Sequence, residues 1–162
     1  GTGVILAAEM AGLAPGRVVA GVLRAMNRPQ GDAARLIAPH AHAMTDVTGF
    51  GLAGHLLSIL DASALAATLD LAAIPLLPGA LALAKAGHGS SLLSANRQAA
   101  ARMWLTEGPQ ADLLFDPQTA GGLLAAVDPD QAPALLAALL AQGETAAVIG
   151  HLAAGAPFIT VD

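Results

Sequence analysis

The chain has 162 residues, a length that suits one domain able to bury roughly two thirds of the surface that its unfolded form exposes. Hydrophobic residues make up 55% of it and aromatic residues only 2%, so the core must be filled by aliphatic side chains and alanine. The net charge of −5 argues against nucleic-acid binding, which depends on clustered Lys and Arg, and the lack of cysteine excludes disulfides and thiolate metal sites within this chain.

The first part of the chain predicts a short strand and then two helices. Thr2–Ala8 is an apolar run that we predict as a strand, and its abrupt start suggests a domain cut from something longer. Ala14–Gly16 then opens an amphipathic helix whose arginines lie opposite its apolar face, an arrangement that we interpret as a solvated face. The next helix, Asp32–Ala38, has Asp32 in the position of an N-cap.

The middle of the chain predicts alternating strands and helices. His40–Val47 is predicted as a strand that leads into the helix Gly49–Ser63. One side of this helix carries only small and weakly polar residues, so another element, a partner domain or a ligand can approach its backbone. Ala64–Leu71 is predicted as a strand, Pro78–Gly87 as a short helix, and the chain is expected to become helical again from about Ser94.

The last part of the chain predicts a strand, a helix and two closing strands. The strand is Gly122–Val127 and the helix is Asp130–Gly143, whose apolar run is about half of the ~20 residues that span a membrane. The closing strands, Ala146–Leu152 and Pro157–Asp162, are expected to be joined by a hairpin-like connection. The whole pattern predicts an α/β or α+β layered fold with a mixed β-sheet covered by helices. Because no basic leader of a signal peptide is visible, we expect a cytoplasmic protein without a membrane segment.

The sequence MTDVTGFGLAGH, residues 44–55, places one carboxylate, two threonine hydroxyls and three glycines where a strand meets a helix. In open α/β sheets ligands bind at such strand ends, and a helix start offers N–H groups to an anion. The Asp46 carboxylate would repel a phosphate unless a hard cation lay between them, and carboxylates with phosphate oxygens bind Mg²⁺ in this way. The alternative interpretation is structural: Asp46 or Thr48 caps the helix and contributes about 1 kcal/mol.

A second motif, DPQTAGG at residues 116–122, has similar turn-forming residues directly before a strand. It lacks the lysine of a phosphate-binding Walker loop and the glycine spacing of a dinucleotide fingerprint, so by itself it predicts a turn. The five histidines are scattered without a zinc pattern, and we interpret them as structural. No serine lies in a nucleophile elbow and there is no cysteine, so the options for covalent catalysis within this chain are poor.

Together the two motifs resemble the C-terminal half of the selenophosphate synthetase (selenide, water dikinase) family, and the likeness extends to GTGVI, IPLLPGA, SANR and IGHL. The resemblance implies a fold like the C-terminal domain of aminoimidazole ribonucleotide synthetase, within a wider group of ATP-binding proteins. It also implies the family's reaction, in which ATP, selenide and water give selenophosphate, AMP and phosphate. In that family Mg²⁺ bridges the triphosphate and several aspartates, one of which matches Asp46.

Under this resemblance residues 1–162 are a single C-terminal domain, with residues 1–8 as the end of an interdomain connection. The family's catalytic cysteine or selenocysteine and its other metal-binding aspartates belong to the N-terminal domain, so we expect this fragment to be inactive alone. Its expected partners are ATP, selenide, the N-terminal domain and a second copy in a full-length homodimer, with no nucleic acid and no membrane. Asp46 is the expected metal ligand. The residues expected to shape the nucleotide cleft are Thr45, Thr48, Gly49, Gly51, Gln118 and Thr119.

Two alternatives to this family assignment stay open, and one segment departs from the family's pattern. The chain could belong to a related ATP-dependent enzyme, for example of purine synthesis or thiamine phosphate metabolism, or it could be a non-catalytic docking module of a fusion protein. The departure is GHGSSLLSANR, where many members of the family have a glycine-rich GGT segment before the asparagine. The role of Asn96 is therefore undecided by the sequence, as is that of His55.

Overall fold

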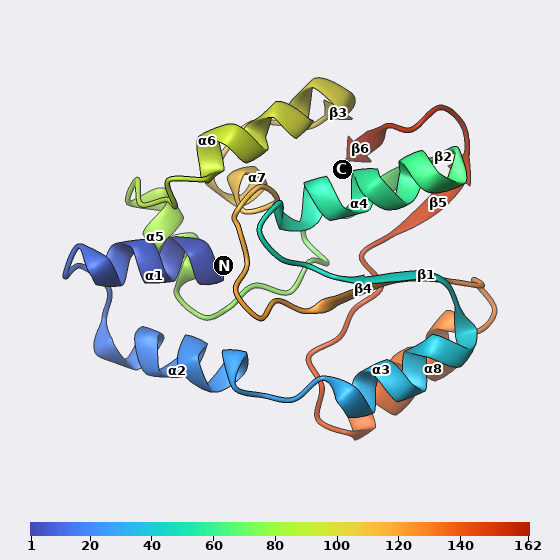
Figure 1. Ribbon diagram of the computed structural model, residues 1–162, viewed down its shortest axis with the longest axis horizontal. Helices are drawn as coiled ribbons and strands as arrows, with labels where there is room; N and C mark the ends of the chain where they lie inside the picture. The colour runs from blue at the N-terminus through green and yellow to red at the C-terminus, as the bar shows by residue number, and fades with distance from the viewer.

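The computed structural model describes all 162 residues, and helices alternate with strands along the chain (Figure 1). The strands are β1 (Ala41–Asp46), β2 (Leu65–Leu69), β3 (Met103–Trp104), β4 (Leu123–Val127), β5 (Gly150–Ala154) and β6 (Ile159–Val161). The α-helices are α1 (Thr2–Met10), α2 (Gly16–Met26), α3 (Gly31–Ile37), α4 (Gly51–Ser63), α5 (Ala80–Lys85), α6 (Leu93–Asn96), α7 (Pro109–Asp112) and α8 (Ala132–Ala141). The 3-10 helices are η1 (Ala38–His40) and η2 (Arg97–Arg102).

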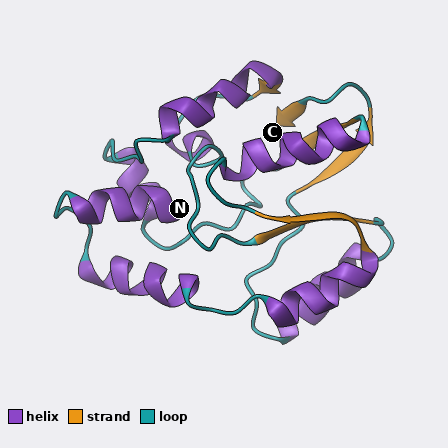
Figure 2. Ribbon diagram, in the orientation of Figure 1, coloured by secondary structure: helices purple, strands orange, loops and turns teal.

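The strands form a four-stranded mixed sheet and a separate two-stranded antiparallel ribbon of β1 and β4. In the four-stranded sheet the order is β3-β6-β2-β5, and β2 is antiparallel to β5 but parallel to β6. Figure 2 shows helices on both sides of the β1–β4 ribbon, with α4 on one side and α3 and α8 on the other. This arrangement confirms the expected layered α/β class with a mixed sheet and covering helices. No helix is both long and apolar enough to cross a membrane.

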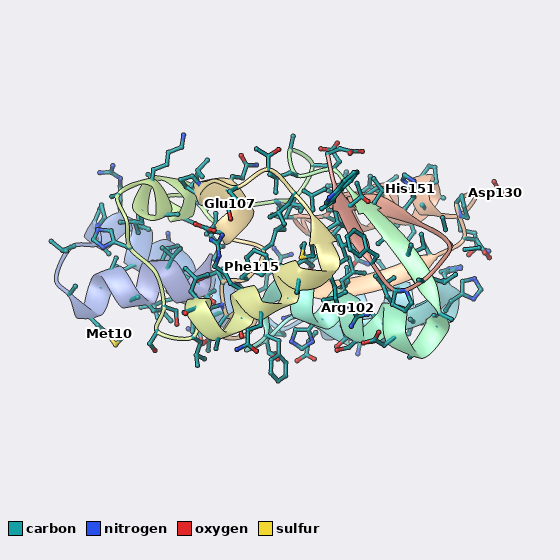
Figure 3. The ribbon with its side chains drawn as sticks, turned by 90° about the horizontal axis from the view of Figure 1, so that it is seen from above. Met10, Arg102, Glu107, Phe115, Asp130 and His151 are labelled. Atoms are coloured by element: carbon teal, nitrogen blue, oxygen red, sulfur yellow. The ribbon has the colours of Figure 1, made fainter.

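The core is divided into three clusters of aliphatic side chains. The largest joins α4 to β2, β3 and β6 and includes Leu60 and Phe115, both fully buried; Figure 3 shows Phe115 in the interior of the molecule. A second cluster packs α1, α2 and α5 together, and a third holds α3 and α8 against the β1–β4 ribbon. Each large side chain buried in this way contributes about 2–3 kcal/mol. The ribbon is thus packed on both sides: α3 and α8 cover one side, and Leu124 of β4 packs against the largest cluster on the other.

Three expectations about the elements are wrong. Thr2–Ala8 is part of helix α1, because Val4, Ile5 and Ala8 follow helical spacing and are all buried against α2 and α5. Asp32 is not an N-cap, because α3 begins at Gly31 and the Asp32 carboxylate pairs instead with Arg35.

The closing strands are not a hairpin either. Strands β5 and β6 lie on opposite sides of β2 and pair with it, so the connection between them passes the end of that strand. The short α7 and β3 were not anticipated, and only four residues near Asn96 are α-helical before the chain continues as η2. The other predicted elements, including β1, α4, β4 and α8, are present within a few residues of their expected bounds.

Candidate functional site

The antiparallel ribbon brings the two motifs together, although they are far apart in the sequence. Asp46, the last residue of β1, is paired with Leu123 of β4. Beyond the ribbon the main chains stay bonded, because the Val47 N–H donates to the Gly122 carbonyl at 2.9 Å and the Gln118 N–H donates to the Thr48 carbonyl at 3.0 Å. The first motif (Met44–His55) and the second motif (Asp116–Gly122) therefore form one continuous surface at the end of β1.

Asp46 presents a free carboxylate at this surface. The residue is exposed, and its side chain takes part in no hydrogen bond or ion pair within the chain, while Thr45 donates its hydroxyl to the Asp46 main-chain carbonyl at 3.0 Å. The interpretation of Asp46 or Thr48 as a helix cap is wrong, because the N-cap of α4 is Phe50 and no side chain caps that helix. Asp46 is thus available as an oxygen ligand, and the chain has no cluster of three His, Cys, Asp or Glu residues that would form a metal site without outside help.

The loop after Asp46 is held by His55 from the first turns of α4. The Thr48 N–H donates to Nε2 of His55 at 3.0 Å, and the Thr48 hydroxyl lies 3.1 Å from the same nitrogen. Because a backbone N–H can only donate, Nε2 must be unprotonated and the neutral ring carries its hydrogen on Nδ1. The Phe50 ring packs at a tilt against His55, with 5.7 Å between ring centroids, yet remains 68% exposed.

Two glycines of the first motif have different surroundings. Gly51 has a φ of +70°, and a Cβ there would lie 2.7 Å from the Leu114 carbonyl oxygen, so α4 can approach the segment before the second motif only through glycine. Gly49 has open space around it, and the N–H groups of Gly49 and Phe50 have no hydrogen-bond partner in the chain. Among the N–H donors from Val47 to Phe50 these two are the ones without a partner, and the Asp46 carboxylate is unpaired as well.

The side chains of the second motif serve helix α1, a role that the local sequence does not signal. One Asp116 oxygen accepts a hydrogen bond from the Gly3 N–H at 3.0 Å, and Oε1 of Gln118 accepts one from the Thr2 N–H at 3.1 Å. The Thr119 N–H donates to the Thr2 hydroxyl at 2.8 Å, whereas the Thr119 side chain is exposed. These contacts satisfy N–H groups at the start of α1, which have no partner within the helix.

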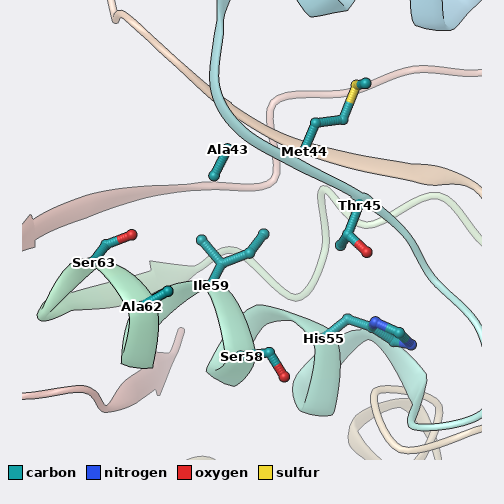
Figure 4. Close-up of a pocket in the computed structure, with 8 residues that line it drawn as sticks. All are labelled: Ala43, Met44, Thr45, His55, Ser58, Ile59, Ala62 and Ser63. Carbon is teal, nitrogen blue, oxygen red and sulfur yellow. The ribbon is translucent and has the colours of Figure 1, made fainter.

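A hollow of about 270 Å³ lies between β1 and α4, on the side of the helix that carries small residues (Figure 4). Thr45 contributes to one wall, and His55, Ser58 and Ile59 contribute to the other. The sequence predicted that the backbone of α4 would be approachable on this side. The hollow begins directly beside the strand that ends in Asp46.

Asn96 is a residue whose role the sequence left open and the structure makes specific. Its Nδ2 atom donates to the Gly49 carbonyl at 2.8 Å and to the Phe115 carbonyl at 2.9 Å. One side-chain amide is therefore bonded to the first motif and to the residue directly before the second. The sequence placed Asn96 in the SANR segment of the family likeness but did not indicate these two main-chain partners.

Comparisons with known proteins give a family for the chain. The sequence profile of the family described as "AIR synthase related protein, C-terminal domain" matches residues 2–162. The selenide, water dikinase of Pelobacter propionicus is 40% identical over 159 residues, which cover 94% of this chain and 45% of that protein. The selenide, water dikinase of Pseudomonas straminea is 41% identical over 142 residues, which cover 84% of this chain and 39% of that protein. The chain therefore spans less than half the length of these curated relatives.

A solved structure supports the fold. The thiamine-monophosphate kinase of Stenotrophomonas maltophilia matches 78% of this chain and 33% of its own, with a TM-score of 0.52 and 22% sequence identity. At this identity the likeness concerns the arrangement of helices and strands alone. It agrees with the layered α/β architecture expected from the sequence.

Proposed function

The chain belongs to the AIR synthase related protein family, as its C-terminal domain, and from this premise we propose that it is the C-terminal domain of a selenide, water dikinase. In this proposal a longer protein that contains the chain makes selenophosphate, AMP and phosphate from ATP, selenide and water. The support is the identity of about 40% to two such enzymes over most of this chain. The catalytic groups would lie outside this chain, which we expect to be inactive alone.

The observation that carries the role of this domain is a free Asp46 carboxylate in the same loop as the two free N–H groups of Gly49 and Phe50. A phosphate bound by the Gly49 and Phe50 N–H groups would bring negative charge to the loop that also carries this carboxylate, and two unit charges 4 Å apart repel by about 1 kcal/mol in water and about 4 kcal/mol near a protein surface. A divalent cation between them turns this repulsion into attraction. The exposed, unpaired carboxylate is a hard oxygen donor of the kind Mg²⁺ prefers, so the residues present fit the ion.

The proposed tasks of the remaining residues follow from their contacts. Asp46 would supply one ligand to Mg²⁺, which neutralises charge on the triphosphate when bound, and the other ligands would be phosphate oxygens, water and the rest of the longer protein. Thr45 and Thr48 would shape the cleft wall beside Gly49, whose N–H would donate to a phosphate oxygen. Gln118 and Thr119 would act from farther away, because their hydrogen bonds to Thr2 hold α1 on the second motif. We propose a homodimer for the longer protein.

The product of ATP turnover tests this proposal. The longer protein should form AMP from ATP only when selenide is present, and Mg²⁺ should be required. Formation of ADP without a need for selenide would instead indicate a related kinase or synthetase of the same family. A protein that binds no nucleotide at all would favour a docking module, and either result would refute the proposed reaction.

A further inference from the structure

We infer that Asn96 is a positioning residue that fixes the loop Thr48–Phe50 in place by fastening Gly49 to the segment that leads into the second motif. The fastening is a property of this chain alone. Its value for nucleotide binding rests on the proposed function, because Gly49 and Phe50 carry the N–H groups proposed to meet the phosphates. Asn96 makes no contact with those phosphates in this account and is not a catalytic residue.

The hydrogen-bond geometry uses the whole donor capacity of the Asn96 side chain. The amide nitrogen has two hydrogens, and two carbonyl oxygens lie within bonding distance of it: Gly49 at 2.8 Å and Phe115 at 2.9 Å. Both distances are typical of N–H···O bonds. No other side chain is hydrogen-bonded to both carbonyls, so this amide is a specific bridge between two separate stretches of main chain.

Without Asn96, Gly49 itself would make no hydrogen bond within the chain. The Gly49 carbonyl accepts only from Asn96, and the N–H groups of Gly49 and Phe50 have no partner in the chain. A Cβ on Gly49 would meet nothing within 4 Å, so packing does not restrain this residue either. Its neighbours are held differently: Thr48 by His55, and Gly51 by close contact with Leu114.

The neighbouring residue, Arg97, fixes Asn96 itself. The Arg97 guanidinium lies 5.7 Å from the centroid of the Phe115 ring and forms an ion pair with Asp112. Phe115 is fully buried in the largest core cluster, so this anchor is part of the rigid body of the fold. Arg97 therefore holds the end of α6 against the segment before the second motif. Asn96, the last residue of α6, bonds from there to the loop of the first motif.

Hydrogen exchange of single amides in the 162-residue chain tests the fastening directly. Asn96→Asp is nearly isosteric but replaces the two donors by carboxylate oxygens that face two carbonyls. The Thr48 N–H, bonded to His55, and the Gln118 N–H, bonded to Thr48, should exchange at least about tenfold faster, since two net hydrogen bonds are lost at this point. Amides of β2 and α8 should keep their protection.

Gln98→Glu is the matched control, because Gln98 is an exposed amide two residues away and makes no side-chain hydrogen bond. It adds the same charge to the same segment and should leave every amide unchanged. If Asn96→Asp unfolds the chain, Asn96→Ser, which retains one donor, should give a smaller acceleration confined to the loop. Unchanged exchange at Thr48 and Gln118, or an equal acceleration across the whole chain, would overturn the inference.

A kinetic test in the longer protein separates this inference from the proposed function. Asn96→Ser should raise the KM for ATP by about tenfold while changing kcat less, whereas Gln98→Ser should change neither. A loop that loosens in hydrogen exchange without any change in the KM for ATP would overturn the nucleotide role of the fastening. If the unsubstituted protein uses no ATP, the proposed function fails, and the exchange measurements still decide whether Asn96 holds the loop.

Discussion

The substitution Gly121→Ala should break the junction of the two motifs, and the adjacent Gly122 supplies a matched control. A Cβ on Gly121 would lie 2.0 Å from the Val47 carbonyl oxygen and 2.7 Å from the Gln118 Cβ. The first of these atoms belongs to the main chain and cannot rotate away. The two motifs would therefore have to separate at the point where the loop leaves β1.

The expected loss of stability has two parts. Forcing a methyl group into a packed site costs typically about 1–3 kcal/mol. Separating the chains also stretches the bonds from Val47 to Gly122 and from Gln118 to Thr48, each with a net value of about 1 kcal/mol. Gly121→Ala should therefore lower the free energy of unfolding by about 3–5 kcal/mol.

Gly122→Ala should behave in the opposite way. A Cβ there meets nothing within 4 Å, and the backbone is not in the left-handed region, so the change should be neutral or stabilise the chain by up to about 1 kcal/mol. Urea unfolding of both variants, followed by circular dichroism at equal m-values, measures the difference. Equal stabilities for the two variants would refute the steric reasoning and the close approach of the motifs on which it depends.

Three further predictions concern single side chains. Asp46→Asn in the longer protein should lower Mg²⁺-dependent turnover by about 10- to 100-fold, and unaltered kinetics would contradict this. The free energy of unfolding should shift by less than about 0.5 kcal/mol, because the exposed carboxylate makes no hydrogen bond or ion pair in the chain. Ala64→Gly should stabilise the chain by about 0.5–1 kcal/mol in thermal unfolding, because Ala64 ends α4 with a φ of 52°; a loss of stability would contradict the strain. Hydrogen bonds from Arg102 hold the pKa of Asp61 below its usual range, so this ion pair stabilises the fold above about pH 4 and is lost as the pH falls through the lowered pKa. Asp61→Asn should therefore flatten the acid limb of the stability curve, and an unchanged limb would argue against the pair.

The sequence predicted those elements in which the hydrophobic periodicity and the turn-forming residues at the ends indicate the same structure. Helix α4 has a broad apolar arc that packs into the largest core cluster, and β1 ends at the polar residues of the first motif, as expected. Helix α1 was missed because its β-branched residues favour a strand locally. Its buried face is matched by α2 and α5, and its first N–H groups are bonded by Asp116 and Gln118, more than a hundred residues away.

The candidate site was predictable only in part, because local sequence does not specify contacts between distant segments. Sequence spacing placed Asp46 at a strand end but left open whether it caps the helix, and only the structure shows that its carboxylate is unpaired. The two motifs meet because β1 pairs with β4, and nothing in either motif specifies that partner. The role of Asn96 depends on the path of the chain between α5 and η2, where short helices and turns give no periodic signal.

The two motifs have different roles, although their composition is similar. In the second motif the Asp116 and Gln118 side chains bond to α1, and Gly121 lets the main chain approach Val47. In the loop Asp46–Phe50 of the first motif, the Asp46 carboxylate and the N–H groups of Gly49 and Phe50 are free. On the proposed function, this domain therefore meets the triphosphate through main-chain N–H groups and a single metal ligand. Asn96 and Gly121 are not ligands in this proposal, but they hold those groups in place, so substitutions at these two positions test it most directly.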